Sequence, residues 1–548
     1  MVRKFTEAQL RGSLHFLLDF KWAGRTVHLA GRRLTAPIGE AGADVEYFPG
    51  LKWARSFDRR FGIGSSGASG TSAGLTLFLY PHVDVPAMMA AGHVLGSATA
   101  RLMLWADGSN DTLTILDGAV RDPAWTSAEE PITGTLEVAP TVDAGLIPGP
   151  NARVKAPTGG ATWTAFDLTI GGEYYPIVFG SPAGAKQRTR GSPALYVNHN
   201  PGSERVLIAG HHTHAGANSS KVFISNLSDG IGAEETAVNG YDDLGQPVTT
   251  ADLSGWVAPP SDGDDLWCAW TSAAGVASYG MLADDGSAPM QGAGDVLQWM
   301  LRRSTVPHDT SRIAALAEYI NTYTLATYAM AERGERVPPW HWIQDALLPL
   351  LPVSLHYGDR GLFLQPWRHT ATAADAIADL NADAGGNSTR LSNVNSTPRD
   401  AVATTVEVSY DVDPRTNSPA ESVTLSGDPA ILDDVVEAVE DPWLTEAWRI
   451  YGTTKTEAKS ARAVEDSGTA GRIASWVSRM HGPQRSIAVY QVDQYPGGLL
   501  DPGSVVTITD TVRGWASRPA IVHAAQWSDS GRVDIEIHVP AFPRGEAA

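Results

Sequence analysis

The chain has 548 residues, of which 43% are hydrophobic and 19% charged, a composition typical of globular and not of disordered proteins. The chain contains 41 Lys and Arg and 61 Asp and Glu, which gives a net charge of −20. This charge disfavours tight binding to phosphate backbones, because such binding needs clusters of cations. A single cysteine, Cys268, excludes an intramolecular disulfide framework and a cysteine-rich zinc or iron–sulfur site.

The length predicts three or four domains, at roughly 150 residues per domain. The basic N-terminal stretch lacks a clean apolar core and a cleavage site, so we expect no signal peptide. The longest apolar run, residues 346–355, contains two prolines and is half of the about twenty residues that a membrane-spanning helix needs. We therefore expect a soluble protein made in the cytoplasm, without a membrane anchor.

The first half of the chain is rich in strand-like segments. Residues 74–80 and 132–138 carry β-branched and aromatic runs, and residues 100–118 predict a hairpin that turns at 107–110. A Pro/Gly cluster at 145–160 predicts a linker or long loop. Further strands are expected at 162–182, 205–215 and 220–227.

The middle of the chain has helical periodicity. Apolar positions recur at helical spacing in residues 292–304, and a second helix is expected from an N-cap at Asp309 to Gly334. Pro338 and Pro339 suit the first turn of a third helix, and residues 354–367 predict a hairpin that turns at 358–361.

The last part mixes strands with two helices. Residues 401–413 alternate as a strand does, and residues 428–442 predict a helix capped by Asp428 with Ile431, Leu432, Val435, Val436 and Val439 on one face. Residues 469–483 predict a second helix, with Ile473, Trp476, Val477 and Met480 as its apolar face. Four more strands are expected, at 486–493, 504–510, 520–528 and 532–539.

These elements predict an α+β, mostly β, multidomain chain. The expected division is an N-terminal β-rich domain at 1–145, a second β-rich domain at 146–262, an α+β middle domain at 263–400, and a C-terminal β-rich domain with inserted helices at 401–548.

Two short motifs match catalytic patterns without their required context. Residues 62–67 fit the dinucleotide fingerprint G-x-G-x-x-G, and residues 70–74 fit the nucleophile elbow around Ser72. Both motifs need a helix to follow, whereas a strand is expected here, so both are interpreted as loops. The acidic groups lack EF-hand spacing and are interpreted as solvated turn carboxylates: Asp262/Asp264/Asp265, Asp242/Asp243 and Asp411/Asp413.

Three histidines within residues 211–214 are the strongest metal candidate. If the segment is a strand, His212 and His214 point to one face and His211 to the other, and neutral imidazole is a good zinc ligand. No carboxylate follows to act as a third ligand or general base. The alternative interpretation is a polar strand end in a subunit contact or lumen wall, and we assign no catalytic, cofactor or metal residues.

The order of the parts resembles that of the baseplate hub or tail-tip proteins of tailed bacteriophages and gene-transfer particles. Two β-rich domains precede the helical block at 292–321 and the block at 338–364, and the segments 497–511 and 524–539 lie near the end. The segment 171–182, GGEYYPIVFGSP, is also similar to such proteins.

This resemblance implies two tube-like β-barrel or sandwich domains per subunit and a homotrimer that joins a sixfold tail tube to a threefold tip. It implies tail tube and distal tail proteins above, tip or fibre proteins below, a place in the virion tail tip, and a channel through which DNA passes without specific binding. Some members of this family carry a cysteine cluster for an iron–sulfur centre or a wall-degrading domain. This sequence shows neither, so we expect no enzymatic activity and no cofactor.

Two alternatives stay open. One is a distal tail ring protein, which the helical middle and the length make less favoured. The other is a metal-dependent cell-wall hydrolase that uses His212 and His214. A sugar-binding tip protein is a third, weaker interpretation.

Overall fold

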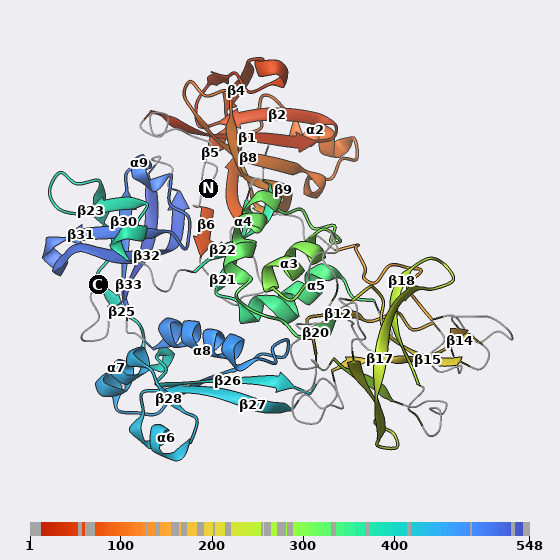
Figure 1. Ribbon diagram of the computed structural model, residues 1–548. Helices are drawn as coiled ribbons and strands as arrows, with labels where there is room; N and C mark the ends of the chain where they lie inside the picture. The colour runs from red at the N-terminus through yellow and green to blue at the C-terminus, as the bar shows by residue number, and fades with distance from the viewer. Residues whose placement is uncertain are drawn as a thin grey trace.

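The computed structural model describes most of the chain, and all structural statements below concern the described ranges. These are residues 12–52, 57–60, 72–125, 127, 130–137, 143–154, 164–165, 172–182, 191–200, 203–213, 221–253, 256, 265–270, 281, 289–329, 336–358, 360–367, 372–413, 418–482, 485–527 and 532–540. The fold is mostly β, with several sheets and a smaller number of helices, as expected from the sequence (Figure 1).

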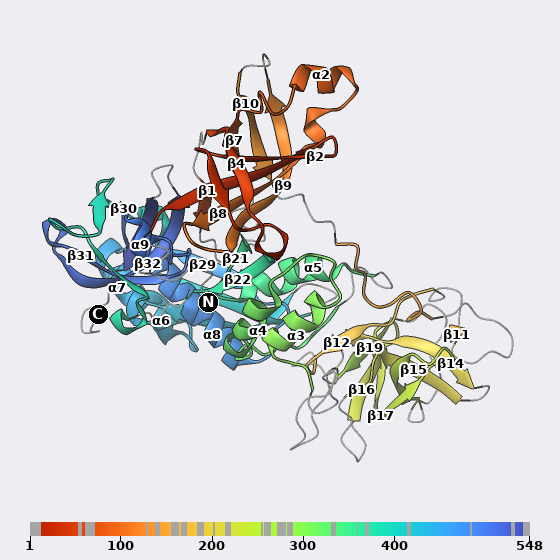
Figure 2. The ribbon, with the colours of Figure 1, turned by 90° about the horizontal axis from the view of Figure 1, so that it is seen from above.

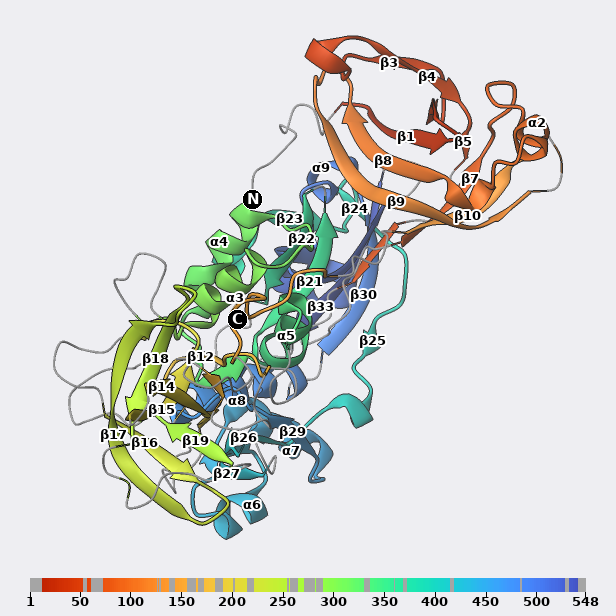
Figure 3. The ribbon, with the colours of Figure 1, turned by 90° about the vertical axis from the view of Figure 1, so that its right-hand side faces the viewer.

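The first sheet curls into a near-closed barrel, seen end-on in Figure 3. Its order is β3-β4-β2-β1-β8-β9-β10-β7-β5. The predicted hairpin at 100–118 is confirmed, because β8 and β9 pair antiparallel across the turn. The strands are β1 (Leu14–Trp22), β2 (Arg25–Ala30), β3 (Leu34–Ala36), β4 (Val45–Pro49), β5 (Leu51–Lys52), β7 (Ser72–Leu77), β8 (Thr99–Ala106), β9 (Thr112–Ala124) and β10 (Ile132–Glu137).

One glycine lets this barrel close. Gly50 separates β4, which pairs with β2, from β5, which pairs with β7 at the other end of the sheet. The Gly50 amide donates to the carbonyl of Ala30 at 3.0 Å, and its carbonyl accepts from the amide of Phe78 at 2.7 Å. A Cβ on Gly50 would lie 2.6 Å from the Phe78 carbonyl oxygen and 2.8 Å from Leu29 Cδ2, so only glycine fits this crossing.

A second curved sheet is closed in the same way, by one chain segment whose two halves pair at opposite ends of the sheet. Its order is β11-β14-β15-β18-β17-β16-β19-β13, and its two ends meet because β13 and β14 are halves of one segment that breaks at Ala194. Leu207, Ile224 and the lone Cys268 are fully buried inside it. The strands are β11 (Thr164–Ala165), β13 (Ser192–Pro193), β14 (Leu195–Asn200), β15 (Ser203–Ala209), β16 (Lys221–Asn226), β17 (Ile231–Tyr241), β18 (Pro247–Asp252) and β19 (Leu266–Ala269).

The helical middle lies between the N-terminal barrel and the second curved sheet, which is called the second barrel below (Figures 1 and 2). Asp309 caps its second helix as predicted, accepting from the amides of Ser311 and Arg312 at 3.1 Å. The predicted hairpin at 354–367 is confirmed, with Gly358 opposite Gly361. The elements are α3 (Ala293–Leu301), α4 (Thr310–Ile320), α5 (Pro339–Trp342), a π turn (Ile343–Leu347), β21 (Val353–Gly358) and β22 (Gly361–Pro366), with β12 (Ile177–Phe179) paired to β20 (Thr327–Ala329).

The prediction that the second of these helices runs to Gly334 is wrong. Helix α4 ends at Ile320, and the β-branched and aromatic stretch that follows becomes strand β20. The Asn321 side chain accepts from the Asp295 amide and donates to the Asp295 carboxylate, both at 3.0 Å, which fixes the chain as it leaves the helix. Residues 330–334 lie outside the described ranges.

An α/β layer follows, in which α8 covers a four-stranded sheet of order β28-β27-β26-β29. The predicted face of α8 is largely confirmed, since Ile473, Trp476 and Val477 are buried and Met480 packs beside them. The elements are β26 (Thr405–Val412), β27 (Pro419–Ser426), α6 (Pro429–Asp434), β28 (Val439–Glu440), α7 (Pro442–Tyr451), β29 (Thr456–Ser460) and α8 (Ser467–His481).

The apolar face predicted for residues 428–442 is wrong, although Asp428 is the N-cap as expected. Helix α6 ends at Asp434, Val435 adopts an extended conformation, and Val436 is 99% exposed. None of the α6 residues is buried, so packing does not hold the helix beyond its capped first turns. Val439 instead forms part of the short edge strand β28.

The chain ends in another barrel-like sheet of order β23-β31-β32-β33-β30-β24, and the four predicted terminal strands are confirmed. Its strands are β23 (Ala378–Asn381), β24 (Ser388–Arg390), β25 (Asn395–Ser396), β30 (Arg485–Val492), β31 (Val505–Asp510), β32 (Trp515–Trp527) and β33 (Val533–Pro540). The remaining helices are α2 (Val85–Ala90), α9 (Gln494–Gly497) and the 3-10 turns Glu40–Gly42, Leu95–Ser97, Leu348–Leu350, Ala373–Asp375, Arg399–Ala401 and Thr511–Arg513.

Strand β6 (Phe57–Arg60) joins the first barrel to the last one. It leaves the N-terminal barrel between β5 and β7 and pairs antiparallel with β32, with Ala524 opposite Arg60 (Figure 1). Leu499 adds to this joint by packing into the core of the N-terminal barrel. The N-terminal and C-terminal barrels are therefore neighbours in space, although β6 and β32 lie near opposite ends of the sequence.

The buried side chains show which segments share a core. The largest hydrophobic cluster runs from Ile147 through the helical middle to Val477 in α8, so the middle and the α/β layer pack together. The division of the sequence into four domains remains a prediction. No helix in the described ranges combines the length and the apolar character needed to cross a bilayer.

Candidate functional site

The predicted histidine segment lies where strand β15 has already ended, at Ala209. His211 is buried, and its Nε2 accepts from the Val178 amide at 2.9 Å. Because an amide can only donate, the ring proton sits on Nδ1, which donates to the His212 carbonyl at 3.1 Å. Burial lowers the pKa of His211 to about 4, so this ring is neutral and both its nitrogens are occupied.

His212 has a different environment. Its Nε2 donates to the Gly240 carbonyl at 2.8 Å, and its ring packs edge-on against Tyr241 with centroids 4.8 Å apart. Thr213 is buried beside them, and its amide donates to the Asn239 side chain at 3.0 Å. His214 lies outside the described residues. The described part of the segment, residues 211–213, is therefore anchored to strands β17 and β18.

A cavity of about 690 Å³ adjoins these histidines, between the second barrel and the helical middle. The Arg303 guanidinium stacks on the Trp299 ring at 3.7 Å along its wall. The described lining residues include no Ser, Thr, Cys, Lys, Asp or Glu, so these residues supply neither a nucleophile nor a carboxylate base. His211 and His212 are the imidazoles among them.

Asp143 holds the segment that borders this cavity. Its carboxylate accepts from the amides of Gly145, Thr305 and Trp340 at 2.9–3.0 Å. Burial alone would raise the pKa of Asp143, but these hydrogen bonds outweigh it, and the pKa is lowered. The carboxylate thus ties the start of the second β-rich region to the helical middle.

The acidic groups singled out in the sequence have structural contacts where they are described. Asp242 is buried and not solvated, contrary to the expectation, because it accepts from Tyr175 Oη at 3.0 Å and from the amides of Leu244 and Gln246. Asp265 accepts from Trp267 Nε1 at 3.0 Å. The motif at 62–67, Asp262 and Asp264 lie outside the described residues, and Ser72 begins strand β7 rather than a helix.

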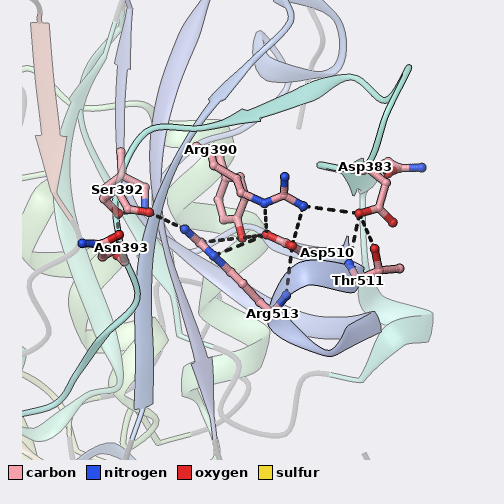
Figure 4. Close-up of polar contacts among 10 residues, drawn as sticks. Asp383, Arg390, Ser392, Asn393, Asp510, Thr511 and Arg513 are labelled. Carbon is pink, nitrogen blue, oxygen red and sulfur yellow. Dashed lines mark hydrogen bonds and ion pairs between the residues drawn. The ribbon is translucent and has the colours of Figure 1, made fainter.

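The densest charged cluster lies in the C-terminal barrel (Figure 4). Asp510, fully buried at the end of β31, accepts from Arg390 Nε at 2.9 Å, Arg390 Nη2 at 2.6 Å and Tyr490 Oη at 2.8 Å. Arg513 donates to Tyr490 Oη at 2.7 Å and also to the Ser392 carbonyl. Asp383 accepts from Arg390 and from Thr511, so the cluster fastens the 383–392 segment to the barrel.

A metal-compatible group was missed by the sequence reasoning. His523, Glu536 and His538 place one potential ligand atom each within 4.8 Å of one another, on the outer face of β32 and β33. The spacing Glu536-Ile537-His538 in an alternating strand puts two ligand types on one face and was a usable signal. The partner strand's contribution, His523, depends on the pairing register of β32 with β33, which the sequence does not reveal.

No family model matches the chain, and no curated protein matches it. Among solved structures it is similar to the 43 kDa tail protein of prophage MuSo2 from Shewanella oneidensis, with 10% identity, 96% of this chain and 98% of that chain covered, and a TM-score of 0.38.

It is also similar to a tail protein from Neisseria meningitidis, with 12% identity, 59% and 92% coverage and a TM-score of 0.26. A third match is a chain of a native gene transfer agent virion, with 17% identity, 48% and 82% coverage and a TM-score of 0.19.

Proposed function

We propose that this chain is a structural protein of a phage-like tail: a baseplate hub that joins the sixfold tail tube to the threefold tip and lines part of the DNA-ejection channel. The observation that carries the proposal is the pairing of β6 with β32, which couples two barrel-like units of one chain edge to edge. Three copies of such a chain present six such units. A threefold ring of this kind can therefore match the sixfold symmetry of a tail tube.

The composition supports this role. A net charge of −20 gives the assembly a surface that repels phosphate, so DNA can pass without being held. The chain crossings at Gly50 and Ala194 bring the ends of their sheets together, which leaves fewer exposed strand edges that would pair with wrong partners. The proposed partners are two further copies, tube and distal tail proteins above, and tip or fibre proteins below, in the virion tail.

The proposal takes the chain as non-enzymatic. The hydrolase alternative needs His212 and His214 to share a metal, and His212 already uses Nε2 to hold the Gly240 carbonyl. The distal-ring alternative leaves the helical middle and its α/β layer without a role. The α/β layer lies on the side of the C-terminal barrel that faces away from the N-terminal barrel and suits contacts to a tip of lower symmetry (Figure 1).

The test is mass and symmetry of the purified full chain, by light scattering and electron microscopy class averages. A threefold ring with six similar densities supports the hub. A monomer that persists at high concentration contradicts it. The zinc content of the wild type and of His212→Ala tests the hydrolase alternative. That alternative requires about one equivalent of zinc in the wild type and its loss in the variant.

A further inference from the structure

Two neighbouring strands of the C-terminal barrel bring two imidazoles and a carboxylate together on their outer face. Glu536 and His538 are two apart on β33 and point the same way, and His538 Nε2 lies 3.0 Å from Glu536 Oε1. His523 comes from the adjacent strand β32, and its ring stacks on that of His538 with centroids 4.2 Å apart and planes 12° from parallel.

The pairing register of β32 with β33 positions His523. Ile521 lies opposite His538 and Val522 lies opposite Ile537, so strand alternation puts His523 on the same outer face as His538 and Glu536. A β-bulge follows, in which His523 is the extra residue between the pairs Val522–Ile537 and Ala524–Glu536. Strand pairing therefore brings the three potential ligands together.

We propose that His523, Glu536 and His538 bind one divalent transition-metal ion, with zinc as the ion that suits the ligand set best. The proposal is independent of the hub function. Two imidazoles and a carboxylate are a common zinc set, and tetrahedral zinc needs ligand atoms about 3.3 Å apart, which small side-chain rotations provide from a 4.8 Å cluster.

The charge and exposure of the cluster also suit a metal. Glu536 adds a negative charge beside the two stacked rings, and that charge offsets part of the charge of a bound dication. The Glu536 side chain is 28% exposed and that of His538 is 14% exposed, so the ion can enter from solvent and keep a water as its fourth ligand.

The position gives the ion a structural role. Ala524, next to His523, is the residue of β32 that pairs with Arg60 of β6. An ion that links β32 to β33 at this level stabilises the part of the C-terminal barrel to which the N-terminal barrel attaches. The site therefore acts as a cross-strand staple at the joint between the barrels.

The experiment is a cobalt titration of the full chain after dialysis against chelator, followed by zinc competition. The wild type is expected to bind one equivalent of Co²⁺ with visible ligand-field bands and to lose them to zinc. His538→Gln and His523→Gln are expected to weaken binding at least about tenfold. His341→Gln, an exposed histidine on α5, is the matched control and is expected to bind like the wild type.

Three results overturn the proposal: no saturable cobalt binding by folded wild type, binding unchanged in both cluster variants, or binding lost in His212→Gln and kept in His538→Gln. Glu536→Gln keeps the shape of the side chain, so it tests the site even if a histidine variant misfolds. It is expected to weaken zinc binding and to abolish the increase in melting temperature that zinc gives the wild type.

Discussion

Arg390 and Asp510, 120 residues apart in sequence, form a two-point ion pair in which both carboxylate oxygens accept from the guanidinium. The carboxylate is fully buried and the guanidinium partly exposed. Arg390 lies on the short strand β24, which pairs with β30 over Ser388–Arg390, so this ion pair adds a side-chain attachment of the 383–392 segment to its backbone pairing.

Asp510→Asn is expected to lower the free energy of unfolding of the C-terminal barrel by about 3 kcal/mol, because it leaves Arg390 and Arg513 without their shared counter-charge. Urea denaturation measures this loss, and hydrogen exchange should show faster opening of residues 388–390. Asp400→Asn removes an exposed carboxylate and is the control. Equal stability of the two variants would contradict a structural role for the cluster.

The same carboxylate predicts a pH dependence. Burial would raise the pKa of Asp510, but hydrogen bonds from Arg390 and Tyr490 outweigh it, and the folded pKa is lowered. The unfolded chain therefore binds the proton more readily, and the stabilisation is present above about pH 4 and lost as pH falls through the folded pKa. Below pH 4, wild type and Asp510→Asn should converge in unfolding experiments; a constant difference down to pH 2 would refute this account.

His211 predicts a second dependence of stability on pH, between about pH 4 and 6.5. Its folded pKa of about 4 lies below the usual 6.5, so the unfolded state binds more protons between these values. Stability should be full above pH 6.5 and fall by up to about 1.4 kcal/mol per pH unit toward pH 4. His211→Gln keeps an acceptor for the Val178 amide and should flatten this slope, as measured by denaturation at pH 7.5, 6 and 5.

Gly50→Ala is expected to destabilise the N-terminal barrel by about 1–3 kcal/mol, because the new methyl group collides with the Phe78 carbonyl and with Leu29. Thermal unfolding measures the effect. Gly96→Ala is the matched control in the same barrel, since a Cβ there meets nothing within 4 Å. If both variants have the same melting temperature, the close approach at Gly50 does not determine the stability of the barrel.

Local signals in the sequence were sufficient for much of the fold. The turn at 107–110, the caps Asp309 and Asp428, and the apolar period of α8 act within a few residues, and all appear as predicted. Helix lengths failed where tertiary contacts decide: Tyr328 pairs with Val178 instead of continuing α4. The helical period alone cannot show that a face lacks a partner, as Val436 illustrates.

The sites were harder to predict because they join distant segments. His211 to His214 drew attention by clustering in sequence, yet His211 and His212 use ring nitrogens to hold the backbone. His523 and His538 are separated in sequence and meet through strand pairing. Arg390 and Asp510 carry no motif, because a single arginine and a single aspartate 120 residues apart form no local pattern.

The β6–β32 pairing also has a consequence for the order of folding. The two strands are far apart in sequence, and pairing between such distant segments forms late because the loss of chain entropy has to be offset first. Until β6 docks, residues 524–527 of β32 present an unpaired strand edge, which is a template for pairing with another chain.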